Sequence, residues 1–382
     1  MKRAVLISLG ALSALYALVV TWRQNEKAAG LDFYIYYVNA QLAARDDVAN
    51  IYSPETQERI GEEYYARAQA GTSELRKYDA TRRRRLDNVS SPFLYTTLRW
   101  VSRDYDFALQ QYHALVLFAF LAGVILICRR MGVSWASTLF LLAALLLWYR
   151  GFEADLRVGN VNSLQLLMIG AALWSPPFIA GVIIGLLIAF KPNLILILLL
   201  LPVTRKRLAG AAAGAAIAIV AAAINYGSFN VWIQWVTAAN QFFHRLQTRA
   251  ERNVAPALEL FQRYGTWLSY VIAIALIALV LYRRKRLDDP PLLIGLAILI
   301  YLICAPVVWL HYMVLVIPLA IALLRTRWTA IVALIALAMI AEEPFEMLFR
   351  TPVYPKDAML ITPALLALFA CGVWSYAHPR TA

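Results

Sequence analysis

Long apolar segments separated by short basic clusters run through most of the chain. The first covers residues 4–22, behind Lys2 and Arg3, and a polar, helix-prone stretch follows at 23–107. The later apolar segments cover 109–127, 134–149, 161–174, 177–203, 208–225, 266–282, 291–305, 313–324, 328–341 and 358–375. This pattern predicts helices in a bilayer, because in lipid a helix satisfies its own backbone hydrogen bonds.

The segment at 177–203 decides the topology, because Lys191-Pro192-Asn193 interrupts it. As one helix, it would leave three basic clusters on the extracytoplasmic side, against the positive-inside rule. These clusters are 205–207, 283–286 and Arg325 with Arg327. A reversal at Lys191-Pro192 makes all three cytoplasmic, and proline disfavours helix in the residue before it. The resulting segments of roughly 12–14 residues are too short to cross a bilayer and are tolerated only beside a protein cavity, so we expect Lys191 at a cavity below the outer surface.

This topology predicts an all-α polytopic membrane protein with about twelve membrane segments, several of them short, and with both ends cytoplasmic. We expect one transmembrane domain over 1–382, in which residues 23–107 form an extracytoplasmic loop with juxtamembrane helices. The first segment is expected to stay as an anchor, since residues 16–22 offer a poor small-residue cleavage site. We see no convincing internal repeat, which weakens a transporter interpretation.

Composition supports the membrane interpretation and narrows the partners. The 382 residues are 61% hydrophobic and 15% charged, with a mean hydropathy of +0.61, whereas soluble domains are typically about 45–50% apolar and about 25% charged. The net charge of +13 lies mostly in clusters between apolar segments. It therefore orients the helices and does not indicate nucleic-acid binding.

With this topology the unusual polar residues gather on the extracytoplasmic side. No pool of nucleotide sugars is expected there. An activated sugar substrate would therefore reach the site attached to a lipid. Asp32 lies in the aromatic run 30–37 at the membrane boundary. Partial desolvation there favours the protonated form of a carboxylic acid and suits Asp32 to act as a general base. Lys191 is the second anchor, because an ammonium at depth costs about 2.5–3.5 kcal/mol, which a lipid phosphate would offset. The alternative is that Lys191 extends to the interface at a turn.

Other polar residues each have a functional and a structural interpretation. His311, in Trp309-Leu310-His311-Tyr312, suits a lipid phosphate or the orientation of the base, or else it caps a helix in an interfacial aromatic belt. Asn160 and Asn162 suit sugar hydroxyls or the capping of a helix. Glu153 and Asp155 with Arg157 suit a metal pair, although a salt-bridged loop is favoured. The run 82–85 suits anionic headgroups, an acceptor phosphate or a solvated surface.

Together, several short motifs resemble the GT-C class of membrane glycosyltransferases, and within it glycosyltransferase family 87, the DUF2029 type. The motifs are Asp32-Phe33-Tyr34 with Tyr37 and Ile51-Tyr52, Gly159-Asn160-Val161-Asn162, Lys191-Pro192, and Pro306 with Trp309-Leu310-His311-Tyr312. Studied members are polyprenol-phosphate-mannose-dependent α-mannosyltransferases. The resemblance implies a GT-C fold, a lipid-linked sugar donor, Asp32 as catalytic base, and Lys191 and His311 near the donor phosphate. Family members often have Gln in place of Asn160 and His in place of Tyr312.

The sequence therefore predicts an inverting membrane glycosyltransferase that transfers a hexose, mannose by the resemblance, from polyprenyl phosphate to an extracytoplasmic lipid or glycan acceptor. Asp32 is expected to deprotonate the acceptor, with Lys191, His311 and Arg157 as candidates for binding the departing phosphate. The candidates for sugar or acceptor contacts are Tyr36, Asn160, Asn162, Asn193 and Trp309. We expect no cofactor and no obligatory metal. We expect the protein to lie in a bacterial inner membrane, in contact with membrane lipids.

Two other classes of protein remain open. A lipid or solute transporter without bond chemistry would distribute charged residues along its whole pore, whereas here they gather on one side. A non-catalytic scaffold of an envelope-assembly complex would tolerate replacement of Asp32 and Lys191.

Overall fold

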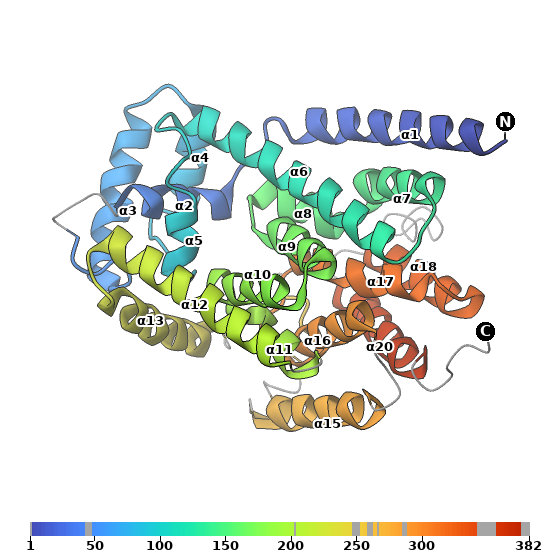
Figure 1. Ribbon diagram of the computed structural model, residues 1–382. Coiled ribbons are helices and arrows are strands. Elements are labelled where there is room, and N and C mark those ends of the chain that lie inside the picture. The colour runs from blue at the N-terminus through green and yellow to red at the C-terminus, as the bar shows by residue number, and fades with distance from the viewer. Residues whose placement is uncertain are drawn as a thin grey trace.

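The helices pack side by side into a bundle with a group of shorter helices at one end (Figure 1). The structure is a computed structural model. It describes residues 2–42, 48–201, 204–246, 253–257, 263–265, 267–284, 289–341 and 357–375. Every regular element among these residues is a helix, as the sequence predicts.

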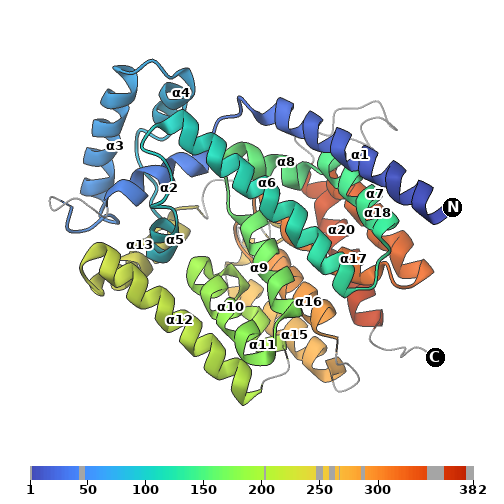
Figure 2. The same cartoon turned by 45° about the horizontal axis from the view of Figure 1, so that its top comes forward.

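Three helices in the described part are each long and apolar enough to cross a membrane: α1 (Lys2–Asn25), α6 (Tyr105–Arg130) and α12 (Arg205–Tyr226). The α6 helix crosses the bundle beside α9 (Figure 2). Helices α7 (Trp135–Trp148) and α8 (Arg150–Val158) are bent by 63° and together have the length of a further span. Shorter apolar helices follow, among them α9 (Asn162–Trp174) and α10 (Pro177–Phe190). The count of about twelve crossings stays a prediction.

Helices α10 and α12 approach each other at backbone distance. Each carries two glycines four residues apart, Gly181 and Gly185 on α10 and Gly210 and Gly214 on α12. A Cβ atom on any of them would lie 2.1–2.2 Å from a carbonyl oxygen of the facing helix. Such small residues let membrane helices associate by close packing where lipid supplies no hydrophobic driving force.

The same contacts show that the two helices run in the same direction, because each step of four residues along α10 is matched by a step of four along α12. The chain between them must therefore turn back. Helix α10 ends at Phe190, Lys191 has an extended backbone, and η1 (Pro192–Leu194) and α11 (Leu196–Leu200) follow. The predicted reversal at Lys191-Pro192 is confirmed, and a continuous helix over 177–203 is excluded.

Four short helices close one end of the bundle: α2 (Leu31–Leu42), α3 (Pro54–Gln69), α4 (Glu74–Arg82) and α5 (Pro92–Thr97). We call these helices and their connections, residues 31–98, the cap; it is the blue-to-teal group in Figure 1. Three of the helices begin behind a serine whose side chain accepts a backbone N–H hydrogen bond. The stretch 23–107 thus contains helices, as expected, and its extracytoplasmic location stays a prediction.

The stretch after α12 contains a further helix, α13 (Asn230–Leu246). Trp232 and Trp235 donate from their indole nitrogens to backbone carbonyls of α12 and of the cap, at 3.2 and 3.0 Å. These tertiary contacts hold one face of α13.

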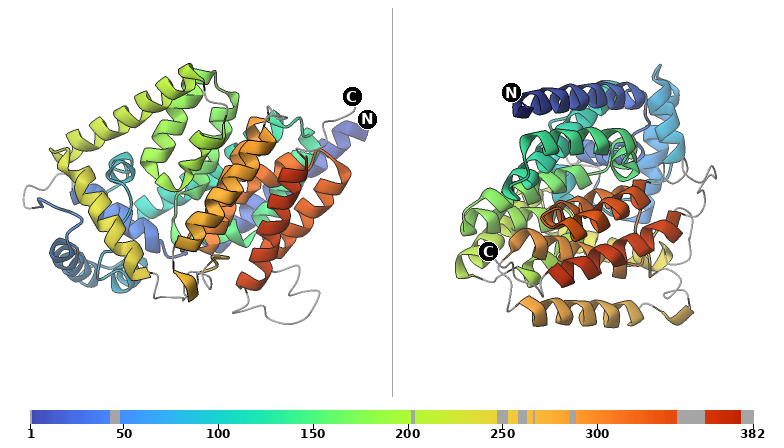
Figure 3. Two further views of the ribbon diagram at one scale, coloured as in Figure 1. Left: turned by 90° about the horizontal axis from the view of Figure 1, so that it is seen from below. Right: turned by 90° about the vertical axis from the view of Figure 1, so that its right-hand side faces the viewer.

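The core lies at α16 (Pro290–Cys304), η2 (Leu310–Val316) and α17 (Ile317–Leu323), whose side chains are almost all buried. Around them pack α15 (Trp267–Arg284), α18 (Arg327–Ala341) and α20 (Asp357–Ser375), seen from two sides in Figure 3. A helix that is apolar all round belongs in the interior of a bundle. His311, in η2, is therefore held by the most buried part of the protein.

Candidate active site

Asp32 lies in the first turn of α2, at the edge of the cap. Its Oδ1 accepts a hydrogen bond from the Arg83 guanidinium (2.7 Å), and its Oδ2 accepts one from the Asn160 amide (2.7 Å). The Asp32 side chain is 20% exposed, so a substrate can reach it. A negative charge in the first turn also interacts favourably with the helix dipole. The carboxylate is thus held from two sides and is still accessible.

A glycine turn brings Asn160 to Asp32. Gly159 ends α8 with a φ of 67°, in the left-handed region that favours glycine. A Cβ atom on Gly159 would lie 2.6 Å from the Cβ of Phe33, the neighbour of Asp32. Glycine therefore satisfies two demands here, the backbone conformation and the close approach of the turn to α2.

A buried carboxylate fixes the other side of this turn. Asp155 is fully buried and accepts hydrogen bonds from the Asn162 amide (2.8 Å) and from the N–H and hydroxyl of Ser163 (2.9 and 2.6 Å). It therefore caps the start of α9 with a negative charge, which favours the helix. The role of Asp155 in the described structure is to hold the segment that carries Asn160.

Lys191 reaches the same turn from the break after α10. Its Nζ donates to the Oδ1 atoms of Asn160 (3.2 Å) and Asn162 (3.4 Å) and lies 4.2 Å from the centre of the Tyr312 ring. Its place after the last turn of α10 also favours a cation. Asn160 therefore bonds both Asp32 and Lys191, and the structure brings the two predicted charges together.

Two buried polar atoms near Lys191 have no hydrogen-bond partner among the described residues: Nε2 of His311 and Nδ2 of Asn193. The Oδ1 atom of Asn193 accepts from the Gln165 amide (2.9 Å). A buried polar atom without a partner is uncommon in a native protein and calls for a ligand, a water or an ion. Both atoms therefore qualify as contacts for a bound substrate.

Aromatic side chains lie at this site. Tyr36 follows Asp32 by one turn on α2, and the Tyr312 ring lies 4.2 Å from the Nζ of Lys191. Tyr36 is buried, and Trp309 is half-buried at the start of η2. The motif that contains His311 therefore lies at the same site as the aromatic run around Asp32.

Three predicted contact residues have other partners. Arg157 is exposed and pairs with Glu153 one turn earlier on α8 (3.3 Å), so the salt-bridged interpretation describes this pair. No described contact joins Arg157 to Asp32 or Lys191. Asn160 and Asn162 use their side chains within the protein, as positioning groups.

Arg83 is a site residue that the sequence analysis did not single out from the run 82–85. It pairs with Asp32 and also donates from Nε to the Leu31 carbonyl (3.1 Å), whereas the next residue, Arg84, pairs with Glu62 (2.6 Å). The spacing of four consecutive arginines carries no signal for which one faces inward. The sequence offered one indication that an arginine of the run 82–85 could reach Asp32: both lie in the stretch 23–107.

Asp79, in α4 of the cap, is also a buried carboxylate, and it holds the start of α2. Its Oδ2 accepts hydrogen bonds from the N–H of Gly30 (3.1 Å) and the hydroxyl of Tyr105 (2.5 Å), while Oδ1 has no partner in the described part of the chain. Burial raises the pKa of Asp79 to about 6, although these hydrogen bonds and the charge of Arg83 act to lower it. The fold therefore favours the protonated form.

We expect Asp79→Asn to become more stable relative to wild type as the pH rises. The pKa of Asp79 is higher in the folded protein than in the unfolded chain, so its protonation stabilises the fold at low pH, and this contribution is lost as the pH rises through about 4 to 6. Asparagine keeps a neutral acceptor at every pH. Thermal unfolding in detergent at about pH 5 and about pH 8 measures the difference, which is at most on the order of 3 kcal/mol. Asp104→Asn, at the exposed start of α6, is the control, and equal differences at both pH values would contradict the expectation.

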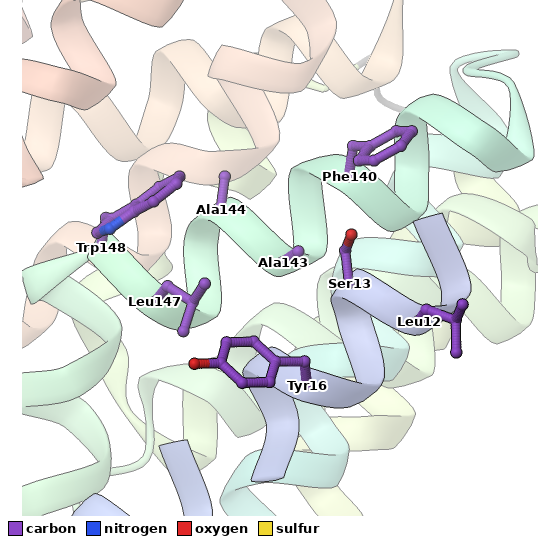
Figure 4. A pocket seen from close by; sticks show the side chains of 8 residues that line it. All are labelled: Leu12, Ser13, Tyr16, Phe140, Ala143, Ala144, Leu147 and Trp148. Atoms are coloured by element: carbon purple, nitrogen blue, oxygen red, sulfur yellow. The ribbon is translucent and has the colours of Figure 1, made fainter. Parts of the chain in front are cut away.

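A cavity of about 460 Å³ lies apart from this site, between α1 and α7 (Figure 4). Its lining is mostly apolar and comprises Leu12, Ser13, Tyr16, Phe140, Ala143, Ala144, Leu147 and Trp148. None of the residues around Asp32 lines it. The described residues also contain no group of three His, Cys, Asp or Glu side chains that could hold a metal ion.

The fold and the site define a helical membrane protein with a partly exposed carboxylate, an arginine and a lysine gathered at one place. A family model for glycosyltransferase family 87 matches residues 90–308, more than half of the chain, and the chain belongs to this family. The resemblance seen in the motifs is thus confirmed. Searches of curated proteins and of solved structures returned no match. The matched range contains Asn160 and Lys191, whereas Asp32 and His311 lie outside it.

Proposed function

We propose that this glycosyltransferase transfers a hexose, mannose by family resemblance, from a polyprenyl-phosphate donor to an acceptor on the extracytoplasmic side. The observation that carries the proposal is the shared site of Asp32 and Lys191, which both bond Asn160. The reaction needs a base for the acceptor hydroxyl and a positive charge for the departing phosphate. Asp32 and Lys191 supply these two groups in one place.

In the proposed reaction Asp32 takes the proton of the acceptor hydroxyl while that oxygen forms a bond to C1 of the sugar. The bond between C1 and the phosphate oxygen breaks, its electron pair stays on the phosphate, and polyprenyl phosphate leaves. A single displacement inverts the anomeric carbon and needs one carboxylate. Each Asp32 oxygen accepts one hydrogen bond, from Arg83 or Asn160, so each keeps capacity for another from the acceptor.

The donor phosphate is assigned to Lys191 and His311. Lysine is a compact charge suited to phosphate, and the Lys191 ammonium contacts only amide oxygens and a tyrosine ring in the described structure. The unpartnered Nε2 of His311 adds a hydrogen-bonding atom. Arg157 is left out of this assignment because it is exposed and paired with Glu153.

Sugar contacts are assigned to Tyr36, Trp309 and the Nδ2 of Asn193, which has no hydrogen-bond partner among the described residues. Asn160 and Asn162 are assigned to positioning, since Asp32, Asp155 and Lys191 occupy their side chains. A transporter would not require a carboxylate held ready beside a lysine at one end of the bundle. Membership of a glycosyltransferase family favours bond chemistry as well.

The direct test incubates purified full-length protein with radiolabelled polyprenyl-phosphate mannose and a membrane lipid extract. We expect label to move from the donor to a second lipid or glycan, and no label to move from a nucleotide-linked mannose. Parallel reactions use other hexoses linked to polyprenyl phosphate. Transfer of one of these hexoses in place of mannose would show that the donor class is right and the sugar is wrong. Transfer from the nucleotide sugar, or from none of the lipid-linked sugars, would contradict the proposal.

A further inference from the structure

A second hollow lies on the other side of α2 from Asp32. It has a volume of about 260 Å³ and is lined by Ala40, Gln41, Tyr64, Leu98, Arg99, Val101 and Arg103. Gln41 follows Asp32 by nine positions on the same helix, which places the two side chains on opposite faces at 100° per residue. The hollow is therefore separate from the candidate active site.

The charged groups that line this hollow in the described part of the chain are both positive. Arg99 and Arg103 are exposed, and among the described residues no acidic side chain is part of the lining. Arg99 donates to the Asn225 side chain. The guanidinium of Arg103 has no hydrogen bond or ion pair within the described residues, whereas its carbonyl oxygen accepts from the Tyr37 hydroxyl. The backbone of Arg103 is thus fixed while its charge stays available to an anion.

The hollow lies where two long apolar helices end. Arg103 stands two positions before α6 begins, and Asn225, the partner of Arg99, stands one position before α12 ends. Trp100, between the two arginines, is 54% exposed. Tryptophan next to the end of an apolar helix is typical of the membrane–water interface. We therefore expect the two guanidinium groups to lie at the level of the lipid headgroups.

We propose that this hollow binds the phosphate of an anionic lipid headgroup. Phosphate is the abundant anion of the interfacial layer, and a guanidinium offers it two parallel hydrogen bonds. Basic residues beside the end of a membrane helix attract anionic headgroups electrostatically. The site is independent of the proposed transfer reaction, and its ligand is a lipid that surrounds the protein.

The test measures lipid binding to the full-length protein in neutral detergent by native mass spectrometry. Phosphatidylglycerol is expected to bind more tightly than phosphatidylcholine. Arg103→Gln should lower the apparent affinity for phosphatidylglycerol about fivefold, with the melting temperature unchanged because no described contact of the side chain is lost. Arg99→Gln is the second variant, and it should also weaken the binding of phosphatidylglycerol. This variant loses the hydrogen bond to Asn225 as well, and the melting temperature measures the effect of that loss on stability.

Arg67→Gln is the matched control. Arg67 stacks on Tyr64 (5.2 Å) and pairs with Glu63 (2.5 Å) but does not line the hollow, so its replacement should leave lipid selectivity intact. Binding of glycerol 3-phosphate is measured in the same way, to test whether the hollow takes a soluble phosphate compound in place of a lipid. The proposal is overturned if Arg103→Gln binds phosphatidylglycerol as wild type does, if the two lipids bind equally, or if glycerol phosphate binds as tightly as phosphatidylglycerol.

Discussion

Asp32→Asn should lower the rate of transfer from the lipid-linked donor roughly 10²–10⁴-fold, the range that a general base contributes. Asparagine has nearly the same shape but does not accept the acceptor proton. It also offers one acceptor oxygen where Arg83 and Asn160 both donate, so a modest loss of stability is expected as well. Single-turnover transfer of labelled sugar, measured on protein of verified monodispersity, separates the two effects.

The cap offers a matched control for this variant. Glu62 also pairs with an arginine, Arg84, at 2.6 Å, but both side chains are about half exposed. Glu62→Gln removes a carboxylate from a similar ion pair and should leave turnover near wild type. Turnover by Asp32→Asn equal to that of Glu62→Gln would rule out Asp32 as the base and favour a purely structural ion pair.

Lys191→Met should lower kcat/KM for the lipid-linked donor roughly 10²–10³-fold, as the loss of one group that stabilises developing negative charge does in other enzymes. Methionine keeps most of the length and removes the charge. The hydrogen bonds from Lys191 to Asn160 and Asn162 are also lost, but the bond from Asn160 to Asp32 does not require them. Inhibition by the product, polyprenyl phosphate, should weaken in parallel, which a merely structural role for Lys191 would not produce.

Two further variants interpret the Lys191 result. Lys191→Arg keeps the charge in a planar, larger group and should retain part of the activity. Lys77→Met removes a cation that pairs with Glu74 on the outside of the cap (2.8 Å) and should leave turnover unchanged. Unaltered product inhibition in Lys191→Met would contradict the phosphate assignment.

The positions of the basic clusters and of the helix-breaking proline were enough to predict much of this fold. The reversal at Lys191-Pro192 follows from three basic clusters that have to lie on one side and from the effect of proline on the preceding residue, and the ends of α10, η1 and α11 agree with it. The close packing of α10 on α12 was not predicted. Glycines four residues apart signal such packing only when the partner helix is known.

The meeting of Asp32 and Lys191 was predictable because each is a rare charge beside apolar sequence, for which a shared function is the simplest explanation. The connecting residue was not. Asn160 looks equally suited to a sugar or a helix cap, and only the positive φ of Gly159 and the bonds of Asp155 direct it to Asp32. Arg83 is one of four adjacent arginines, so its selection depends on the packing of α4 against α2.

The short helices beside Lys191 have a consequence for the surrounding lipid. Helices α9 and α10 contain 13 and 14 residues, so each is about 20 Å long at 1.5 Å per residue, against a hydrocarbon layer of about 30 Å. A bilayer adapts to such a mismatch by becoming thinner next to the protein. For the polyprenyl-phosphate donor proposed above, local thinning beside α9 and α10 would let the phosphate reach the depth of Lys191 while the tail stays in the leaflet.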